Sequence, residues 1–117
     1  MDLKIVEHTK QQNVDIIRVL EKRIFLDLTE KFKDEVVLII EKGAQNIIFD
    51  LGNVNVMNSS GLGVLILARD KIEKKGGEIA ICCLLPLMKE IFDRMQFSSF
   101  FTVADDLQGA LAALKQK

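Results

Sequence analysis

The sequence predicts an α/β fold: a single domain over residues 1–117 with a small mixed sheet, mostly parallel, of about four to five strands flanked by about four helices. Two observations support this. Short apolar runs alternate with longer segments of helical periodicity, and parallel strands require such helical crossovers. With one proline, seven glycines and no repeat or low-complexity stretch, the chain offers no linker between domains.

The strands are predicted from short apolar or alternating runs bounded by polar and turn residues. They are residues 3–7, 14–20, 46–51 and 78–84, with a short last strand at 101–103. Gln11, Gln12 and Asn13 separate the first two runs and are predicted to form a turn. The run NIIFDL at 46–51 is typical of a strand buried on both faces.

The helices are predicted over residues 27–42, over 60–75, from Pro86 onward, and after Asp105 or Asp106. Asp27, with Glu30 three residues later, fits a capping pair for the first helix, and Gly43 fits its left-handed stop. The buried faces expected of the last two helices are Met88, Ile91, Phe92 and Met95, and Leu107, Ala110, Leu111 and Leu114.

The charge balance argues against nucleic acid and membrane surfaces as partners. Sixteen basic and seventeen acidic residues give a net charge of -1, so the chain has no strong field to attract polyanions. The longest apolar run, residues 79–88, contains a proline and is far shorter than the roughly 20 residues that a spanning helix needs. The first residues lack the apolar core of a signal peptide, so a cytoplasmic protein is expected.

Catalytic, metal and cofactor sites are not predicted. His8 is the only histidine and is expected at the surface, and no base can be named for a nucleophilic serine. Cys82 and Cys83 are adjacent, so on a strand they would point to opposite faces, and they lack metal-ligand spacing. Gly61 and Gly63 have no third glycine in register for a dinucleotide site. A binding protein rather than an enzyme is therefore expected.

The segment NSSGLG, residues 58–63, is the strongest candidate for a functional site. One interpretation is purely structural, because Asn58 or Ser59 would cap the helix that follows. The other is functional. The loop 52–58 carries Ser59 from the end of a buried strand to a helix N-terminus, and sites gather beyond the carboxyl ends of parallel strands. Free N–H groups at a helix N-terminus would also stabilise a phosphate on the serine.

The chain resembles the STAS domain family, the sulfate-transporter and anti-sigma-factor-antagonist domains. The residues that carry the resemblance are IIFDLGNVNVMNSSGLGVLILARD, the Gly76-Gly77 turn into the next strand, and FTVADDLQGALAAL near the end. The resemblance is close over residues 46–114 and covers residues 3–43 only by the order of elements. It implies a small mixed sheet flanked by helices.

The resemblance also implies a function. Stand-alone bacterial members are anti-sigma factor antagonists, which bind a protein that is both an anti-sigma factor and a serine kinase. The kinase phosphorylates a loop serine and ends the complex, and a phosphatase resets it. The family's acceptor position corresponds to Ser59. Two residues depart from the family pattern: Asn58 replaces the usual aspartate before the acceptor, and Phe25 stands where another acid is common.

The resemblance and the local chemistry place a partner-binding surface around the loop. Its predicted residues are Asn55, Val56, Met57, Asn58, Ser59, Ser60, Gly61, Leu62 and Gly63. The sequence leaves open whether Val56 and Met57 are exposed or fold back into the core. The departures leave a second function open, a STAS module of another assembly: a partner of a lipid-transport ATPase, a stress-signalling complex, or an unphosphorylated scaffold. The oligomeric state is not predicted.

Overall fold

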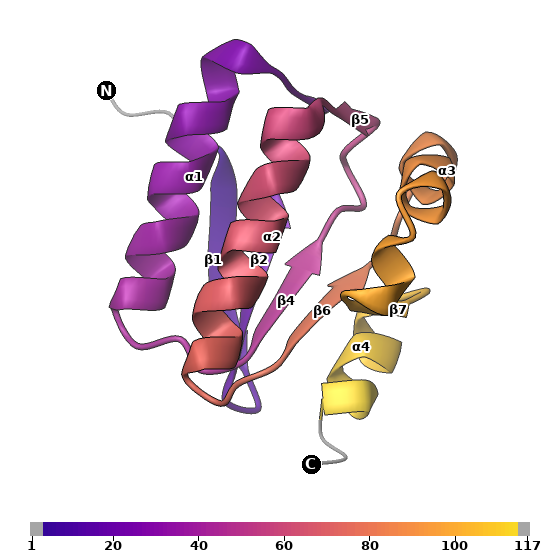
Figure 1. Ribbon diagram of the computed structural model, residues 1–117. Helices are drawn as coiled ribbons and strands as arrows, with labels where there is room; N and C mark the ends of the chain where they lie inside the picture. Colours follow the sequence, from indigo (N-terminus) through magenta and orange to yellow (C-terminus); the bar gives the residue numbers. More distant parts are fainter. Residues whose placement is uncertain (1–3, 115–117) are drawn as a thin grey trace.

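The computed structural model describes residues 4–114, which form a five-stranded sheet with helices on both of its faces (Figure 1). The strands of this sheet are β1 (Val6–Gln11), β2 (Val14–Val19), β4 (Ile47–Asp50), β6 (Ile79–Cys82) and β7 (Thr102–Ala104), in that spatial order. Strands β1 and β2 are antiparallel, and every other neighbouring pair is parallel. The predicted mixed, mostly parallel sheet is confirmed.

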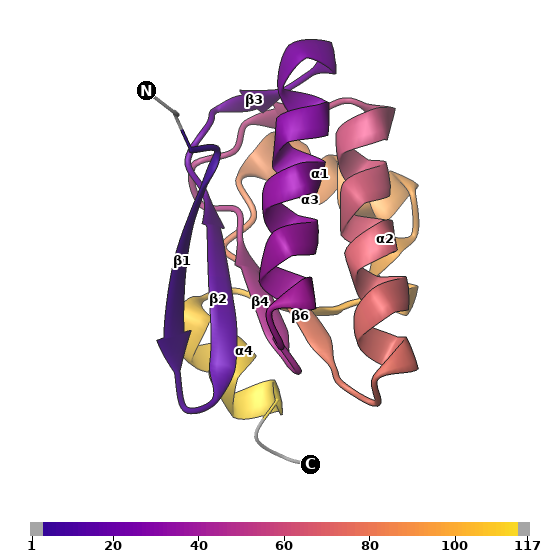
Figure 2. The same ribbon diagram turned by 90° about the vertical axis from the view of Figure 1, so that its left-hand side faces the viewer.

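The helices divide between the two faces of the sheet (Figure 2). They are α1 (Leu26–Glu41), α2 (Ser59–Lys74), α3 (Pro86–Arg94) and α4 (Leu107–Leu114), with a short 3-10 turn, η1 (Phe97–Ser99). Helices α1 and α2 pack side by side on one face, and α4 packs on the other. None of the helices within residues 4–114 has the length and apolar character needed to cross a bilayer.

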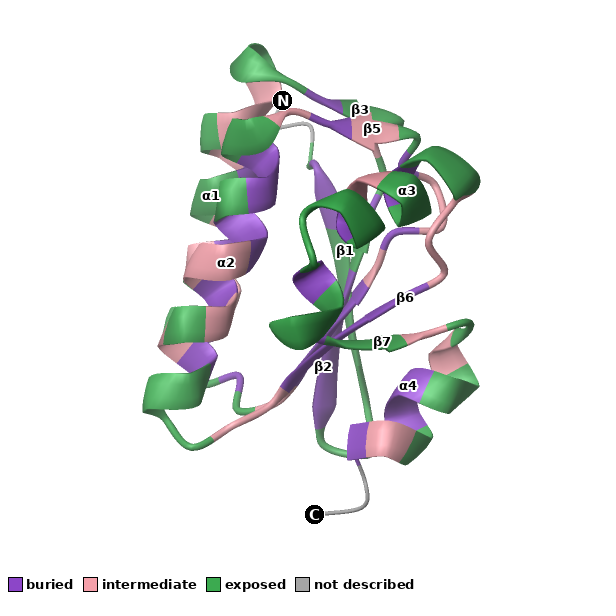
Figure 3. Ribbon diagram, turned by 45° about the vertical axis from the view of Figure 1, so that its right-hand side comes forward, coloured by how far each residue is buried: buried purple, intermediate pink, exposed green. Residues whose placement is uncertain are grey.

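Alternation along the central strands supplies a core on each face, because successive side chains of a strand point to opposite sides. Ile47 and Phe49 of β4 join the larger cluster with α1 and α2, whereas Ile48 joins the smaller cluster with α4. In β6, Ile79 and Ile81 belong to the larger cluster, and Ala80 and Cys82 belong to the smaller one. Figure 3 shows the buried inner sides and exposed outer sides of the helices that cover these strands.

A second sheet, not predicted from the sequence, pairs β3 (Arg23–Ile24) with β5 (Val56–Met57) in parallel. Hydrogen bonds continue the pairing beyond these residues: the Asn55 N–H donates to the Lys22 carbonyl at 2.8 Å, and the Asn58 N–H donates to the Ile24 carbonyl at 3.0 Å. This ladder attaches the loop before α2 to the segment that leads into α1. Strands of two residues are too short to produce a periodic pattern.

The first hairpin differs from its prediction in the length of its turn and in the bounds of its first strand. Gln12 and Asn13 have φ of 55° and 65°, the left-handed pair that a two-residue hairpin turn requires. The turn therefore has two residues rather than three, and β1 extends to Gln11 instead of ending at Glu7. Residue 3, the predicted start of the strand, lies outside the described residues.

Two expectations about the helices are wrong. Asp27 does not cap α1, because the N-cap residue is Phe25, without a side-chain cap, and Asp27 lies within the first turn. Met95 follows the last residue of α3 and is 50% exposed, so it does not extend the buried face of that helix. The stop at Gly43 is confirmed by its φ of 116°. Before α4, Asp106 rather than Asp105 accepts the capping bond, from the Gly109 N–H at 2.8 Å.

Candidate functional site at the start of α2

Asn58 and Ser59 form the junction between the loop and α2. Asn58 is the N-cap residue, with an extended backbone, and its Oδ1 accepts a hydrogen bond from the Gly61 N–H at 2.9 Å. Helix α2 begins at the next residue, Ser59, one residue earlier than predicted. The sequence left the cap open between these two residues, and the structure assigns it to Asn58.

Ser59 and Ser60 are both exposed in the first turn of α2. Neither hydroxyl makes a side-chain hydrogen bond with another residue of the described chain. The first turn of α2 carries no acidic side chain, so the partial positive charge of the helix N-terminus is not neutralised by a neighbour within that turn. A phosphate added to a first-turn hydroxyl would therefore be favoured by the helix dipole.

The apolar part of the loop folds inward. Met57 is only 3% exposed and belongs to the core under α1 and α2, so the possibility of an exposed Val56–Met57 pair is wrong for Met57. Val56 is half-buried. Gly61 and Leu62 are also buried, so neither contributes to the exposed surface. The predicted surface residues that retain access to solvent are Asn55, Val56, Asn58, Ser59, Ser60 and Gly63.

Gly61 and Gly63 occupy different environments. A Cβ added at Gly61 would lie 3.0 Å from Cγ2 of Ile24 and 3.3 Å from the Cβ of Met57, both part of the β3–β5 sheet. A Cβ added at Gly63 would meet nothing within 4 Å among the described residues. Internal packing therefore accounts for the first glycine, whereas nothing in the described chain requires the second.

Two exposed apolar side chains follow β3, the strand that pairs with the loop before α2. Phe25 follows Ile24, whose carbonyl binds the Asn58 N–H, and it is 42% exposed. Leu26, the first residue of α1, is 78% exposed. The sequence analysis noted Phe25 only as a departure from a family pattern and did not single out Leu26. The β3–β5 pairing, which joins the segment just before these residues to the loop, had no sequence signal of its own.

The only histidine lies in the β1–β2 hairpin, a different part of the fold from the α2 junction. His8 is exposed, as expected, and its Nε2 lies 2.6 Å from Oδ1 of Asp15, which is only 5% exposed. No serine hydroxyl shares this hydrogen bond. The geometry of His8 therefore does not supply a base for Ser59.

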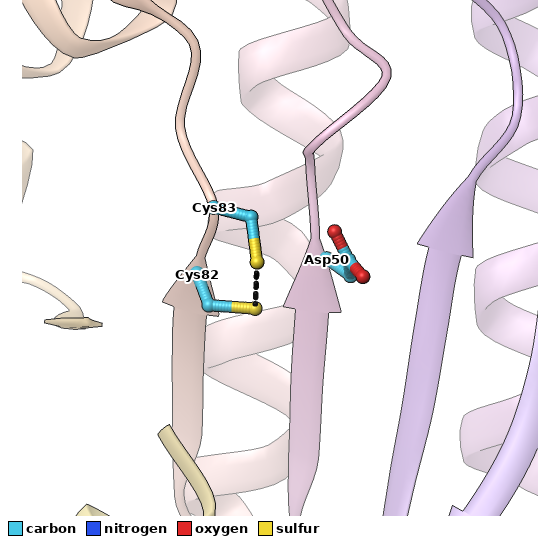
Figure 4. Close-up of side chains that lie close together, drawn as sticks. All are labelled: Asp50, Cys82 and Cys83. Atoms are coloured by element: carbon cyan, nitrogen blue, oxygen red, sulfur yellow. Dashed lines mark hydrogen bonds between the residues drawn. The ribbon is translucent and has the colours of Figure 1, made fainter. Parts of the chain in front are cut away.

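The two cysteines do not point to opposite faces, so that expectation is wrong. Cys82 ends β6, but Cys83 has a left-handed φ of 70°, which breaks the alternation of the strand. Their sulfur atoms lie 3.0 Å apart, beside Asp50 of β4 (Figure 4). Burial is the main cause that raises the pKa of both thiols, and the negative charge of Asp50 adds to it. The two cysteines and Asp50 form a cluster that their spacing in the sequence did not predict.

The fold and this junction together define a class: a small α/β domain that presents an exposed loop serine at the start of a helix. The family model for the STAS domain matches residues 6–110, and the chain belongs to that family. Two named relatives are similar to the chain in sequence. BtrV of Bordetella bronchiseptica, named as a candidate anti-sigma factor antagonist, is 33% identical over 86 residues, which are 74% of each chain.

The second relative, an anti-sigma F factor antagonist of Paenibacillus polymyxa, is 29% identical over 89 residues, 76% of this chain and 74% of its own. Among solved structures, the chain is similar to the Bacillus anti-sigma factor antagonist SpoIIAA. The unphosphorylated form matches with a TM-score of 0.78 at 17% identity, over 96% of this chain and 97% of SpoIIAA. The phosphorylated form matches with a TM-score of 0.70 at 18% identity, over 92% and 97%. These structural likenesses establish the fold.

Proposed function

We infer that this protein is an anti-sigma factor antagonist that binds an anti-sigma factor with serine kinase activity and loses that partner when Ser59 is phosphorylated. A phosphatase would restore binding. Transcription is then regulated indirectly, through the sigma factor that the partner releases. The names of both relatives support the first part of the inference, and the existence of SpoIIAA in two phosphorylation forms supports the second.

The observation that carries the proposal is that Asn58 caps α2 and leaves the neighbouring Ser59 hydroxyl exposed. Asn58 already accepts the capping bond, so α2 does not need the Ser59 hydroxyl to begin. The Ser59 hydroxyl is exposed and is not needed to cap the helix, so it is accessible to a kinase. The phosphate would be held by free N–H groups without unfolding the helix.

The switch follows from electrostatics at the contact. Phosphorylation adds about -1.5 to -2 charge at pH 7. In a close interface that charge must lose its hydration, and without a cationic partner the loss costs several kcal/mol. Phe25 and Leu26, the exposed apolar residues that follow the strand paired with the serine loop, would form the desolvated part of such an interface. A local change of charge therefore suffices to break the complex.

The test uses the protein together with the kinase-type anti-sigma factor of its own host. Complex formation is measured with purified partners, ATP is then added, and the phosphate is located by tandem mass spectrometry. Phosphate on Ser59, accompanied by dissociation, supports the proposal. Phosphate on Ser60 alone transfers the switch to that residue. Stable binding with no phosphate on either serine rejects phosphorylation control but retains the antagonist function.

The departures at two positions support a second function, an interaction module of another assembly. Asn58 lacks the charge of the family's aspartate, and the exposed ring of Phe25 offers an apolar contact where an acid is usual. If the host's kinase-type anti-sigma factors do not bind at all, affinity purification from the host should instead recover a transporter ATPase or a stress-signalling complex. Recovery of a kinase-type anti-sigma factor rejects this second function.

A further inference from the structure

Three residues with metal-binding side chains, Asp50, Cys82 and Cys83, meet at the carboxyl ends of the neighbouring strands β4 and β6. They lie on the face of the sheet opposite α1 and α2. Asp50 and Cys82 are paired across β4 and β6, each as the last residue of its strand. Cys82 belongs to the core cluster under α4. Cys83 turns its sulfur back to Cys82. One ligand atom from each of these three residues lies within 4.8 Å of the others.

We propose that Asp50, Cys82 and Cys83 bind a thiophilic divalent cation of the zinc class. Two thiolates and one carboxylate are ligands that zinc accepts in a tetrahedral site, with a water molecule in the fourth position. Magnesium and calcium prefer oxygen ligands alone, so the two sulfurs select against them. Binding releases the two thiol protons to the buffer and changes no oxidation state.

The backbone at Cys83 supports the proposal independently of the distances. A left-handed conformation costs a residue other than glycine roughly 1–2 kcal/mol. Glycine would adopt the observed φ of 70° without that cost, yet the position holds a cysteine. With ordinary strand geometry its thiol would point away from Cys82. The strained conformation therefore has a chemical consequence, the convergence of two thiols.

The geometry requires only a small adjustment to accept the ion. Two sulfurs bound to one tetrahedral zinc at about 2.3 Å lie about 3.8 Å apart, and here they lie 3.0 Å apart. Cys83 is half-buried, so its side chain has room to rotate, whereas Cys82 is fixed in the core. Asp50 is held by a hydrogen bond from the Gly52 N–H to its Oδ1 at 2.9 Å, and metal-binding carboxylates are commonly oriented in this way.

Access to the site comes from the side of Asp50 and Cys83, because both residues are partly exposed and Cys82 is not. The bound ion would join the ends of β4 and β6 at the point where the chain leaves for the loop that carries Ser59. Gly52, the first glycine of that segment, lies against Cys83: a Cβ added there would be 3.4 Å from the Cβ of Cys83. The site does not depend on the proposed antagonist function.

The test titrates cobalt and zinc into the full-length, metal-free protein under anaerobic reducing conditions. Thiol titration of the unfolded protein first establishes that both cysteines are reduced. Because the chain has only two cysteines, a thiolate-to-cobalt charge-transfer band in the near ultraviolet reports this pair alone. We expect one cobalt per chain, displacement of the cobalt by zinc, and a higher melting temperature with zinc.

Three variants assign the ligands, with folding checked by circular dichroism. Cys83→Ser should abolish the charge-transfer band or reduce it strongly, and zinc should no longer raise its melting temperature. Asp50→Asn retains an oxygen for the Gly52 N–H but loses the charge, and it should weaken zinc binding at least tenfold, which is about 1.4 kcal/mol. His8→Gln removes the only imidazole and should leave the band and the zinc affinity unchanged.

The absence of a charge-transfer band in the fully reduced wild type overturns the site. A band of equal intensity in Cys83→Ser overturns the role of the thiol pair. Unchanged zinc affinity in Asp50→Asn removes the carboxylate from the site, and loss of zinc binding in His8→Gln would move the site to the β1–β2 hairpin. If Cys83→Ser does not fold, Cys83→Ala provides the same comparison.

Discussion

Oδ1 of Asn58 accepts a hydrogen bond from the Gly61 N–H at 2.9 Å, and this bond makes Asn58, not a serine, the cap of α2. Asn58→Ala removes the cap and should lower the free energy of unfolding by about 1 kcal/mol. Urea denaturation followed by circular dichroism measures the change. Ser60→Ala is a matched control at a solvent-exposed first-turn position and should leave the free energy within about 0.5 kcal/mol of wild type. Equal losses in the two variants would contradict the assignment.

Asn58→Asp tests whether the missing charge limits phosphorylation. The carboxylate keeps an oxygen for the Gly61 N–H and adds a negative charge near the helix N-terminus, so the free energy of unfolding should rise by about 0.3–1 kcal/mol. It also restores the residue that the family usually has before the acceptor. With the host kinase and ATP, the initial rate of Ser59 phosphorylation should rise. A lower rate would mean that the kinase has adapted to the neutral amide.

Gly61→Ala and Gly63→Ala form a pair that separates internal packing from partner contact. The methyl group of Gly61→Ala would approach Ile24 at 3.0 Å, so overpacking should lower the free energy of unfolding, by about 1–3 kcal/mol. Gly63→Ala places its methyl in open space and should raise the free energy of unfolding, by up to about 1 kcal/mol. Chemical denaturation of both variants measures these changes.

The same pair reports on binding. If the partner approaches the helix closely, Gly63→Ala should weaken the complex at least tenfold, or about 1.4 kcal/mol, while the protein itself becomes more stable. Isothermal titration with the anti-sigma factor measures that affinity. An unchanged affinity would mean that the interface does not reach Gly63. An unfolding free energy that increases in Gly61→Ala would contradict the packing explanation.

Much of the main sheet and of the helices that cover it was predictable, because these elements are long enough for the spacing of their apolar residues to be recognised. The apolar run at 46–51 and the serine motif after it were sufficient to place Ser59 at the junction of a loop and a helix. The cap could not be assigned in this way, because Asn58 and Ser59 are both good N-cap residues and differ here only through three-dimensional position.

The features that escaped prediction depend on contacts distant in the sequence. The β3–β5 sheet has two residues per strand, so it leaves no periodic signal, yet it joins the segment just before α1 to the serine loop. The conformation of Cys83 also could not be predicted from the sequence, since a left-handed φ is not expected of a cysteine. Strand alternation consequently predicted two separated thiols where the structure has a pair.

The raised thiol pKa values predict a loss of stability at high pH in metal-free protein. Burial raises the pKa of Cys82 above its ordinary value of 9.0. Above pH 9 the unfolded chain therefore releases a proton that the folded chain retains. Stability is fully present below that pH and falls as pH rises, by up to about 1.4 kcal/mol per pH unit for each such thiol. Urea denaturation between pH 8 and pH 10, with a chelator present, measures the slope (about one unit on either side of the ordinary thiol pKa).

Cys82→Ala is the control for that slope, because it removes one titrating thiol and leaves the lysines, which also titrate in alkali. Its free energy of unfolding should start lower, owing to the lost packing of a buried side chain, but should decline less steeply with pH. Parallel slopes in the two proteins would show that the Cys82 thiol is not the source of the alkaline loss.

Ser59→Ala and Ser59→Asp test the switch itself. Because Asn58 retains the cap, the free energy of unfolding of Ser59→Ala should lie within about 0.5 kcal/mol of the wild-type value. This variant should bind the anti-sigma factor even after kinase treatment. Ser59→Asp places one negative charge where phosphate would place nearly two, so it should weaken binding without abolishing it.

Ser60→Asp is the matched control. Successive helical residues point about 100° apart, so Ser60→Asp should weaken binding less than Ser59→Asp does. Affinities come from isothermal titration with the same partner. If Ser60→Asp is the weaker binder, the switch belongs to Ser60. If neither aspartate alters the affinity, the first turn of α2 lies outside the interface and the protein functions as an unswitched module.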